Sequence, residues 1–335
     1  MWLAMVPGMS ETSGGTTMTV AMTIAIPPAV CLIRPPIDMA NSPSTVRYKM
    51  APMTAAQAPS APQLTAVTPA GPPWVGFGRL LHAEWTKIRS VRSTMWSLLA
   101  FVVVAVGFST LIAAVISHDW NAPGNHPNHA RLLTDPTQVI FGAGFGLGQL
   151  AICVLGVIVI TSEYSSGAIR ASLLAVPHRV PMLAAKAVVF GLIDAVLSAI
   201  TVFAVFFITT GILHSHVDIS LSEPGVTRAV IGAILYLTVL GLFALSVGGL
   251  IRHTAGAIAT VIALVIVVPP LVSLIPGTIA NHIHGYLPVT AGMLVTQTTQ
   301  QSGDVLSAWQ GFGVFCAWTA VLLAACGWLL VRRDA

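Results

Sequence analysis

Long apolar runs dominate the chain from residue 79 onward, and each is about twenty residues long, enough to cross roughly 30 Å of hydrocarbon as an α-helix. Five of the runs carry no charge, and one carries a single carboxylate, Asp194. The spacing predicts membrane-spanning helices at about residues 95–117, 139–161, 187–213, 229–251, 257–275 and 309–331. We therefore expect an all-α polytopic membrane protein in which residues 95–335 form one six-span domain.

A shorter amphipathic segment, residues 79–94, precedes the first run. Leu81, Trp85, Ile88 and Val91 recur in it at helical spacing. The basic residues Arg79, Lys87, Arg89 and Arg92 occupy much of the remaining surface. This pattern predicts a helix in the membrane interface whose cations bind lipid phosphates. The alternative is a solvated start of the first span.

Residues 1–78 have a different character. Twelve of the 22 prolines of the chain fall there, among many Ala, Ser and Thr residues. The spacing of these prolines leaves no helical or alternating pattern of apolar residues. We expect a disordered Pro/Ala/Thr-rich extension. Translation from Met50 or Met53 would remove most of it, and the alternative is a genuine but unstructured extension.

Composition supports the membrane assignment and narrows the choice of partners. Hydrophobic residues make up 55% of the chain and charged residues 8%, with a mean hydropathy of +0.85. Soluble domains carry roughly 25% charged residues, so this chain lacks the means to cover a water-facing surface. The net charge of +4 comes from scattered single cations, which argues against a nucleic-acid partner.

The cations also predict orientation. Ten lie on the predicted ends and the loops after the second and fourth spans: Arg79, Lys87, Arg89, Arg92, Arg170, Arg179, Lys186, Arg252, Arg332 and Arg333. The three opposite loops hold only Arg131 and Arg228. Because basic residues accumulate on the cytoplasmic side, both termini are expected in the cytoplasm.

The loop after the second span, residues 162–186, has the pattern of a short helix. Ser165 or Ser166 would cap it, and Pro177 would end it. Ile169, Leu173 and Val176 would form its apolar side. We expect its charged residues at a water-facing boundary and the helix docked on a partner. The alternative is a helix lying on the lipid surface.

Polar side chains within the third span are the next candidates. Asp194 is costly at its depth, so it marks either a polar pathway or an interhelical contact. Ser198 and Thr201 share roughly its helical face and would line such a path. A proton-coupled secondary transporter using Asp194 is thus an alternative function.

Two backbone features complete the spans. Gly144 and Gly148 form a small-xxx-small face suited to close helix packing, either at a dimer seam or within the subunit. Pro269 and Pro270 should kink the fifth span, for gating or for plain packing.

The remaining candidate chemistry in the sequence is metal binding and nucleotide binding. His214, His216, His282 and His284 lie on predicted outer loops and are weak metal-site candidates. They support a membrane-embedded metal-dependent enzyme as a second alternative, although no HExxH motif accompanies them. The chain has no GxxxxGK[ST] sequence, so we expect it to bind no nucleotide or other cofactor itself.

Several short strings resemble a known family when they are read in order. They are Glu84-Trp85-Thr86-Lys87-Ile88-Arg89-Ser90, Ser162-Glu163-Tyr164-Ser165-Ser166-Gly167 with Arg170, Pro177-His178-Arg179, Ala184-Ala185-Lys186, Arg252-His253-Thr254-Ala255-Gly256-Ala257 and Arg332-Arg333-Asp334. On six spans, they resemble permease subunits of the ABC-2 type exporter family in its actinobacterial form. The resemblance covers about residues 79–335.

The resemblance implies a permease without its own ATPase activity. Such a subunit dimerises with itself or with a second permease and works with two copies of an ABC ATPase, which binds ATP and Mg. It would export a hydrophobic or amphipathic small molecule or lipid across the plasma membrane. The family's connecting helix would correspond to Glu84, Trp85, Lys87 and Arg89, and its coupling helix to Glu163, Tyr164, Gly167, Arg170 and Arg179. A partly re-entrant segment, or else a surface-lying helix, is expected within residues 276–308.

Overall fold

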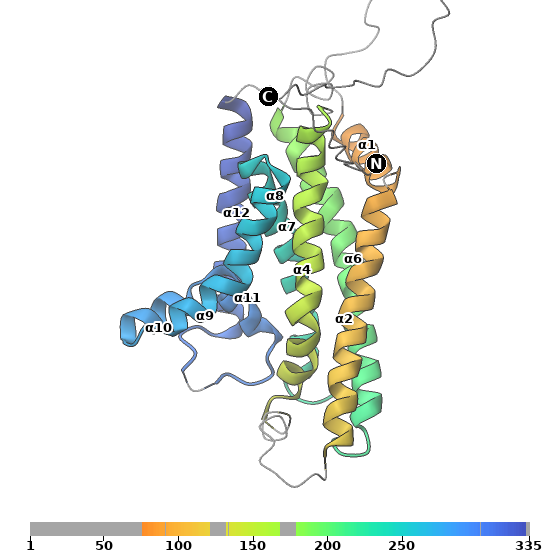
Figure 1. Ribbon diagram of the computed structural model, residues 1–335, viewed down its shortest axis with the longest axis vertical. Coiled ribbons are helices and arrows are strands. Elements are labelled where there is room, and N and C mark those ends of the chain that lie inside the picture. The colour runs from red at the N-terminus through yellow and green to blue at the C-terminus, as the bar shows by residue number, and fades with distance from the viewer. Residues whose placement is uncertain are drawn as a thin grey trace, which may run out of the picture. The chain divides into compact units, whose positions relative to one another are not determined.

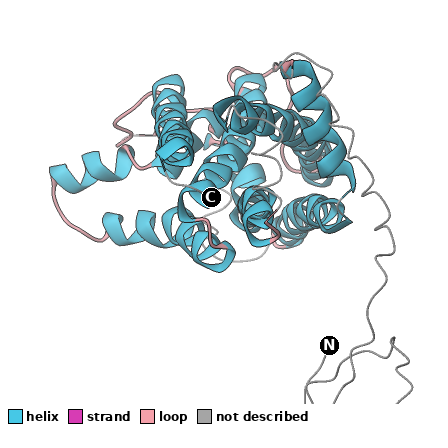
Figure 2. Cartoon of the chain, turned by 90° about the horizontal axis from the view of Figure 1, so that it is seen from above, coloured by secondary structure: helices cyan, strands magenta, loops and turns pink. Residues whose placement is uncertain are grey.

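The computed structural model describes residues 76–90, 92–120, 132, 134–167, 179–301 and 303–332. In this part of the chain every regular element is helical, and Figure 2 accordingly shows helices and loops. Predictions that concern residues 1–75, among them most of the extension and the starts at Met50 and Met53, lie outside the described residues. The extension was predicted to end at residue 78, but Phe77 and Gly78 belong to the first helix.

Six helical segments are long and apolar enough to cross a membrane, as in a multi-pass membrane protein. They are α2 (Arg92–His118), α4 (Pro136–Ser165), α6 (Arg179–Leu213), α7 (Val226–Ile251), the broken segment Thr254–Ser273, and α12 (Ala308–Arg332). The predicted number and order are thus confirmed within the described residues. In Figure 1 the start of α2 and the end of α12 lie at the same end of the bundle.

The main difference from the predicted spans is the start of α6. The sequence prediction began this span at residue 187, whereas the helix begins at Arg179 and passes through Lys186. Helix α4 likewise continues to Ser165, so the loop predicted over 162–186 is shorter than expected. The physical reason lies in Lys186: its charge is neutralised by neighbouring carboxylates, so the helix continues through it.

Helix α7 is the most buried span and packs against α4, α6 and α12. Aromatic rings fill the core around it: Tyr236 lies 6.4 Å from Phe145 and 5.7 Å from Phe315 between ring centroids. Rings at these separations add to the stabilisation from burial alone. This core holds α4 and α12 on either side of α7.

Helices α2 and α4 approach closely at two glycines. A Cβ atom on Gly144 would clash with Ser109 Oγ, and one on Gly148 would lie 2.8 Å from Ala105 Cβ. Because only glycine leaves room for this approach, the two residues serve packing within the subunit. The contact that these glycines make lies within the subunit, between α4 and α2.

The fifth span is broken, as its prolines predict. It consists of α8 (Thr254–Ile262), a π-helical turn, η1 (Ala263–Val267), and α9 (Val268–Ser273). Pro269 and Pro270 lack the N–H donors of an α-helix, and the preceding π turn absorbs the mismatch. In Figure 1 the chain bends away from the bundle along α9 and continues into α10 (Thr278–Gly285).

The segment before α12 folds back into the bundle. It contains α11 (Pro288–Met293) and the 3-10 turn η2 (Leu294–Thr296), which contact α7 and α12. Val289, Ala291 and Val295 are buried there. The surface-lying alternative for this segment is therefore wrong, because its apolar side chains are covered by protein.

Helix α1 (Phe77–Ser90) precedes α2 and packs on α6. Its buried face consists of Leu80, Glu84 and Ile88, four residues apart, while Trp85 is half exposed. The face that packs on protein is thus offset from the apolar face that contains Trp85, and the membrane-interface position of that apolar face stays a prediction. Glu84 lies on the inward face because its carboxylate pairs with the buried Lys186 of α6.

Candidate functional site

Four charged side chains from three helices form a buried ionic cluster at one end of the bundle. Lys186 Nζ on α6 lies 2.5 Å from Glu84 Oε2 and 2.8 Å from Glu163 Oε1. Lys87 Nζ on α1 lies 2.8 Å from Glu84 Oε1 and 3.1 Å from the same Glu163 oxygen. Each ammonium thus donates to both carboxylates, and the cluster joins α1 to the end of α4 and the beginning of α6.

The cluster is removed from water on most sides. Glu84 and Lys186 are each 3% exposed and Glu163 is 8% exposed, whereas the side chain of Lys87 is 40% exposed and forms the outer edge. Burying an isolated charge costs several kcal/mol, roughly, even after relaxation. Two acids and two bases compensate one another here, so removal of a buried member would leave a buried opposite charge with less compensation.

The pKa values of Glu84 and Lys87 reflect this mutual compensation. Burial by itself raises the pKa of Glu84, but the charge and hydrogen bonds of Lys186 and Lys87 outweigh it, so the pKa lies below its ordinary value. Burial likewise lowers the pKa of Lys87, yet Glu84 and Glu163 reverse the shift, and its pKa is raised. Both residues are therefore held in their charged forms at neutral pH.

The structure changes the interpretation of Glu163. The sequence prediction placed its carboxylate at a water-facing boundary and free for a partner, but it belongs to the intramolecular cluster. The reason is that α4 extends beyond residue 161 and carries Glu163 onto the inner face of α1 and α6. Its second oxygen, Oε2, is buried and has no hydrogen-bond partner among the described residues.

The other predicted coupling residues lie around this cluster or outside the described part. Tyr164 lies beneath Arg252, whose guanidinium carbon is 5.3 Å from the ring centroid. Gly167 follows the helix end, exposed and at φ +70°. Arg170 and the predicted helix of that loop lie outside the described residues, and Arg179 begins α6. The predicted connecting residue Arg89 is exposed on α1.

The sequence predicts Lys186 as an orientation charge and as part of a family-like string, but it does not reveal the role of this residue in the cluster. A usable signal was present: Lys186 is followed in α6 by a long apolar stretch and is separated from Arg179 at the helix start by apolar residues. An intramembrane cation normally pairs with an acid. Its partner Glu84 is 102 residues away in sequence, so the partner's identity required the tertiary structure.

Asp194 occupies an interhelical contact between α6 and α7. Ser198 Oγ donates to Asp194 Oδ1 at 3.4 Å, while the other oxygen, Oδ2, lies against Gly241 and has no partner among the described residues. Thr201 instead donates to the Leu197 carbonyl at 2.8 Å. All three predicted polar side chains are fully buried, which favours the contact interpretation over a pathway.

The four histidines proposed as weak metal candidates lie on two separate elements. His214 and His216 follow α6, and the His216 ring lies 4.7 Å from Trp120. His282 and His284 lie on α10, where His282 Nδ1 is 2.9 Å from the Thr278 carbonyl. Within the described ranges no three or more His, Cys, Asp or Glu side chains gather as a metal site would require.

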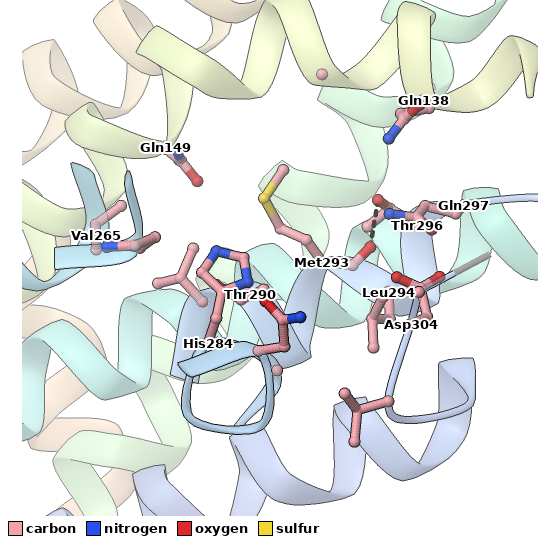
Figure 3. A pocket seen from close by; sticks show the side chains of 17 residues that line it. Gln138, Gln149, Val265, His284, Thr290, Met293, Leu294, Thr296, Gln297 and Asp304 are labelled. Carbon is pink, nitrogen blue, oxygen red and sulfur yellow. Dashed lines mark hydrogen bonds between the residues drawn. The ribbon is translucent and has the colours of Figure 1, made fainter. Parts of the chain in front are cut away.

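A cavity of about 550 Å³ lies between α4 and the folded-back segment. Its polar lining comes from α4, α10, α11 and the following loop, and Val265 and Pro269 of the broken span close another side. Figure 3 shows Gln149, His284 and Met293 pointing toward the same space. Gln149 is positioned by Tyr236, whose hydroxyl donates to Gln149 Oε1 at 2.8 Å.

Two charged side chains hold the loop that follows η2. Asp135, at the N-cap of α4, accepts hydrogen bonds from the backbone N–H groups of Gln138 and Thr298 and from the Thr298 hydroxyl at 2.6 Å. Arg228, in the first turn of α7, donates to the carbonyls of Gln297 and Thr298. The loop is thereby fixed to the start of two spans, next to the cavity.

Comparison with protein-family models finds no match to the chain, and comparison with curated proteins finds no significant similarity.

Proposed function

We propose that this chain is the transmembrane permease subunit of an ATP-driven exporter of the ABC-2 type. It would act as a homodimer or as a heterodimer with a second permease, energised by two copies of a separate ATPase that holds ATP and Mg. The exported molecule would be a hydrophobic or amphipathic small molecule or a lipid, moved across the plasma membrane. The six helices of spanning length and the ordered family-like strings support this proposal.

One observation carries the mechanism: the ionic cluster joins α1 to both helices that flank the predicted coupling segment. Glu163 lies two residues before the end of α4, and Lys186 lies in the third turn of α6. Glu84 and Lys87 tie α1 to both. A force applied to the intervening segment by an ATPase would therefore move α1, α4 and α6 together, because pulling one helix away weakens the compensation of the buried charges on the others.

The proposal assigns a side to each end of the bundle. The cluster end also carries Arg252 and Arg332, so by the charge rule it faces the cytoplasm together with both termini. Helix α1 would lie at the cytoplasmic membrane interface with Trp85 and Arg89 toward lipid. The cavity would then lie toward the outer half of the membrane.

Purification from native membranes in mild detergent tests the class of protein. We expect a nucleotide-binding subunit with ATPase activity to co-elute with the chain. A lone chain that carries bound metal would contradict the proposal and favour the metal-dependent enzyme.

A matched pair of cysteine variants tests the docking site and the orientation. In a chain whose four native cysteines are replaced by alanine, Ser166→Cys should crosslink to the ATPase, whereas Ser222→Cys at the opposite end should not. In intact cells an impermeant thiol reagent should label Ser222→Cys alone. Labelling of Ser166→Cys from outside would invert the proposed topology.

A further inference from the structure

We propose that the cavity beside α4 is a binding site for an uncharged amphipathic molecule whose head bears hydroxyl or carbonyl oxygens, as in an alkyl glycoside, and that it excludes anionic head groups. The binding site follows from the cavity's own geometry. Only the identification of its occupant as the exported molecule rests on the proposed function.

The size of the cavity suits such a ligand. Its volume of about 550 Å³ lies within the roughly 300–1,000 Å³ that is typical of small-molecule sites. The lining combines apolar side chains, including Val265, Val289 and Met293, with amide, hydroxyl and imidazole groups. A molecule with an apolar body and a hydrogen-bonding head matches both parts of this surface.

Gln149 provides the most specific polar contact. Its side chain is 94% buried within the span, and its oxygen is occupied by the Tyr236 hydroxyl. The amide nitrogen is left without a protein partner in the described part of the chain. Because Gln149 lines the cavity, its amide N–H groups can donate to an acceptor oxygen that a ligand supplies.

Further polar side chains in the cavity support the same class of ligand. Asn281, His284, Thr290 and Gln297 line the cavity, and none of them uses its side chain in a hydrogen bond to another described residue. These side chains offer both donors and acceptors in their neutral forms. Several neutral hydrogen-bonding groups around one space are suited to a hydroxyl-rich or carbonyl-bearing head.

The charges that line the cavity favour an uncharged ligand over an anionic one. Among the described residues no Lys or Arg lines the cavity, and the one formal charge there is the carboxylate of Asp304. One of its oxygens, Oδ2, accepts from the Gln301 backbone N–H at 2.8 Å, which holds the carboxylate in place. A phosphate, sulfate or carboxylate head would enter without a counter-ion and beside a like charge, so it is disfavoured.

Photolabelling of the full chain in lipid nanodiscs tests the site. The probe is octyl glucoside with a diazirine in its alkyl chain, and labelled peptides are identified by mass spectrometry. We expect labelling at residues 265–269 and 288–296. Unlabelled octyl glucoside should compete for this labelling, whereas octyl sulfate at equal concentration should not.

Two variants address the hydrogen bonds. Gln149→Leu should reduce the labelling most, but it also removes an acceptor from Tyr236. Thr290→Val preserves the shape of a side chain that has no protein partner, and it should reduce labelling about fivefold, as expected for one lost hydrogen bond. Thr260→Val on α8, outside the cavity, should leave labelling unchanged.

Each result has a defined meaning. Competition by octyl sulfate equal to that by octyl glucoside, or stronger competition by octyltrimethylammonium, would overturn the neutral assignment. Equal labelling of Thr290→Val and Thr260→Val would overturn the site. The ATPase co-elution is a separate outcome: if it fails while site-specific labelling persists, the export function is wrong and the binding site stands.

Discussion

The two ends of α4 each bury a carboxylate, but they compensate it in different ways. Glu163, near the end of the helix, is met by the ammonium groups of Lys87 and Lys186 from two other helices. Asp135, at the start of the helix, is met by neutral N–H and O–H groups, some from its own first turn and some from the loop at Thr298.

Compensation by lysine ammonium groups and compensation by neutral donors connect different parts of the protein. Long lysine side chains carry full charges, so they fix whole helices to one another and make the joint depend on every member. Backbone donors carry only partial charges and short reach, so they fix a loop to a helix start. The Glu163 end is therefore suited to moving three helices as a unit, and the Asp135 end to holding the loop beside the cavity.

The largest expected effect is at the charged end. Lys186→Met leaves two buried carboxylates with only the peripheral Lys87, so the free energy of unfolding should fall by about 3–5 kcal/mol. Denaturant titration of the protein in detergent micelles measures this loss. Lys87→Met is the matched control and should cost less, because its side chain is 40% exposed. Equal losses would show that the burial of Lys186 is immaterial.

At the neutral end, Asp135→Ala removes the shared acceptor of α4 and the Thr298 loop. A buried donor left unpaired costs about 1–3 kcal/mol, and the loss should be local. We expect faster amide hydrogen exchange at residues 297–301 with little change at the charged end. Asp119→Ala provides the control because that carboxylate is half exposed. Unchanged exchange in the loop would contradict the assigned role of Asp135.

The comparison of the two ends of α4 assumes that the helix between them is held firmly. Its close contact with α2 contributes to this, and substitutions at that contact test it. Gly148→Ala places a methyl group 2.8 Å from Ala105 Cβ and should destabilise the protein by about 1–3 kcal/mol. Gly146→Ala on the same helix meets nothing within 4 Å and should be neutral or stabilising, since alanine favours the helix. Thermal unfolding of both variants measures the difference, and identical midpoints would refute close packing here.

The smallest expected effect is the response of the charged end to acid. The pKa of Glu84 is lower in the folded protein than its ordinary value of 4.5, so the unfolded chain binds more protons between the two values. The stability that Glu84 contributes is present above pH 4.5 and is lost as the pH falls through the folded pKa. Unfolding midpoints of the wild type and Glu84→Gln should therefore converge on acidification. A constant difference would argue against the shift.

Much of the architecture was predictable because it depends on local pattern. Uncharged runs of sufficient length predicted the six spans, and Pro269 and Pro270 predicted the break in the fifth. Gly144 and Gly148 predicted a close helix contact, although not which helix would make it. Each of these properties depends on neighbouring residues and on the length of hydrocarbon to be crossed.

The errors arose where partners distant in sequence determined the environment of a residue. Lys186 was expected in the loop before the third span, and Glu163 was expected to face water, because each was judged by its own charge. Helix α1 likewise turns Glu84 toward the protein, where Lys186 of α6 compensates its charge. In all three cases the compensating charge comes from another helix.

The sequence by itself determined that the described part of the chain is helical with six segments able to span a membrane, because hydrophobic length and charge are local properties. Only the tertiary structure decided that Glu84, Lys87, Glu163 and Lys186 form one cluster and that residues from α4 and the segment before α12 enclose a cavity. The physical reason is that pairing energies between distant groups become favourable only when folding brings them together and removes water from between them.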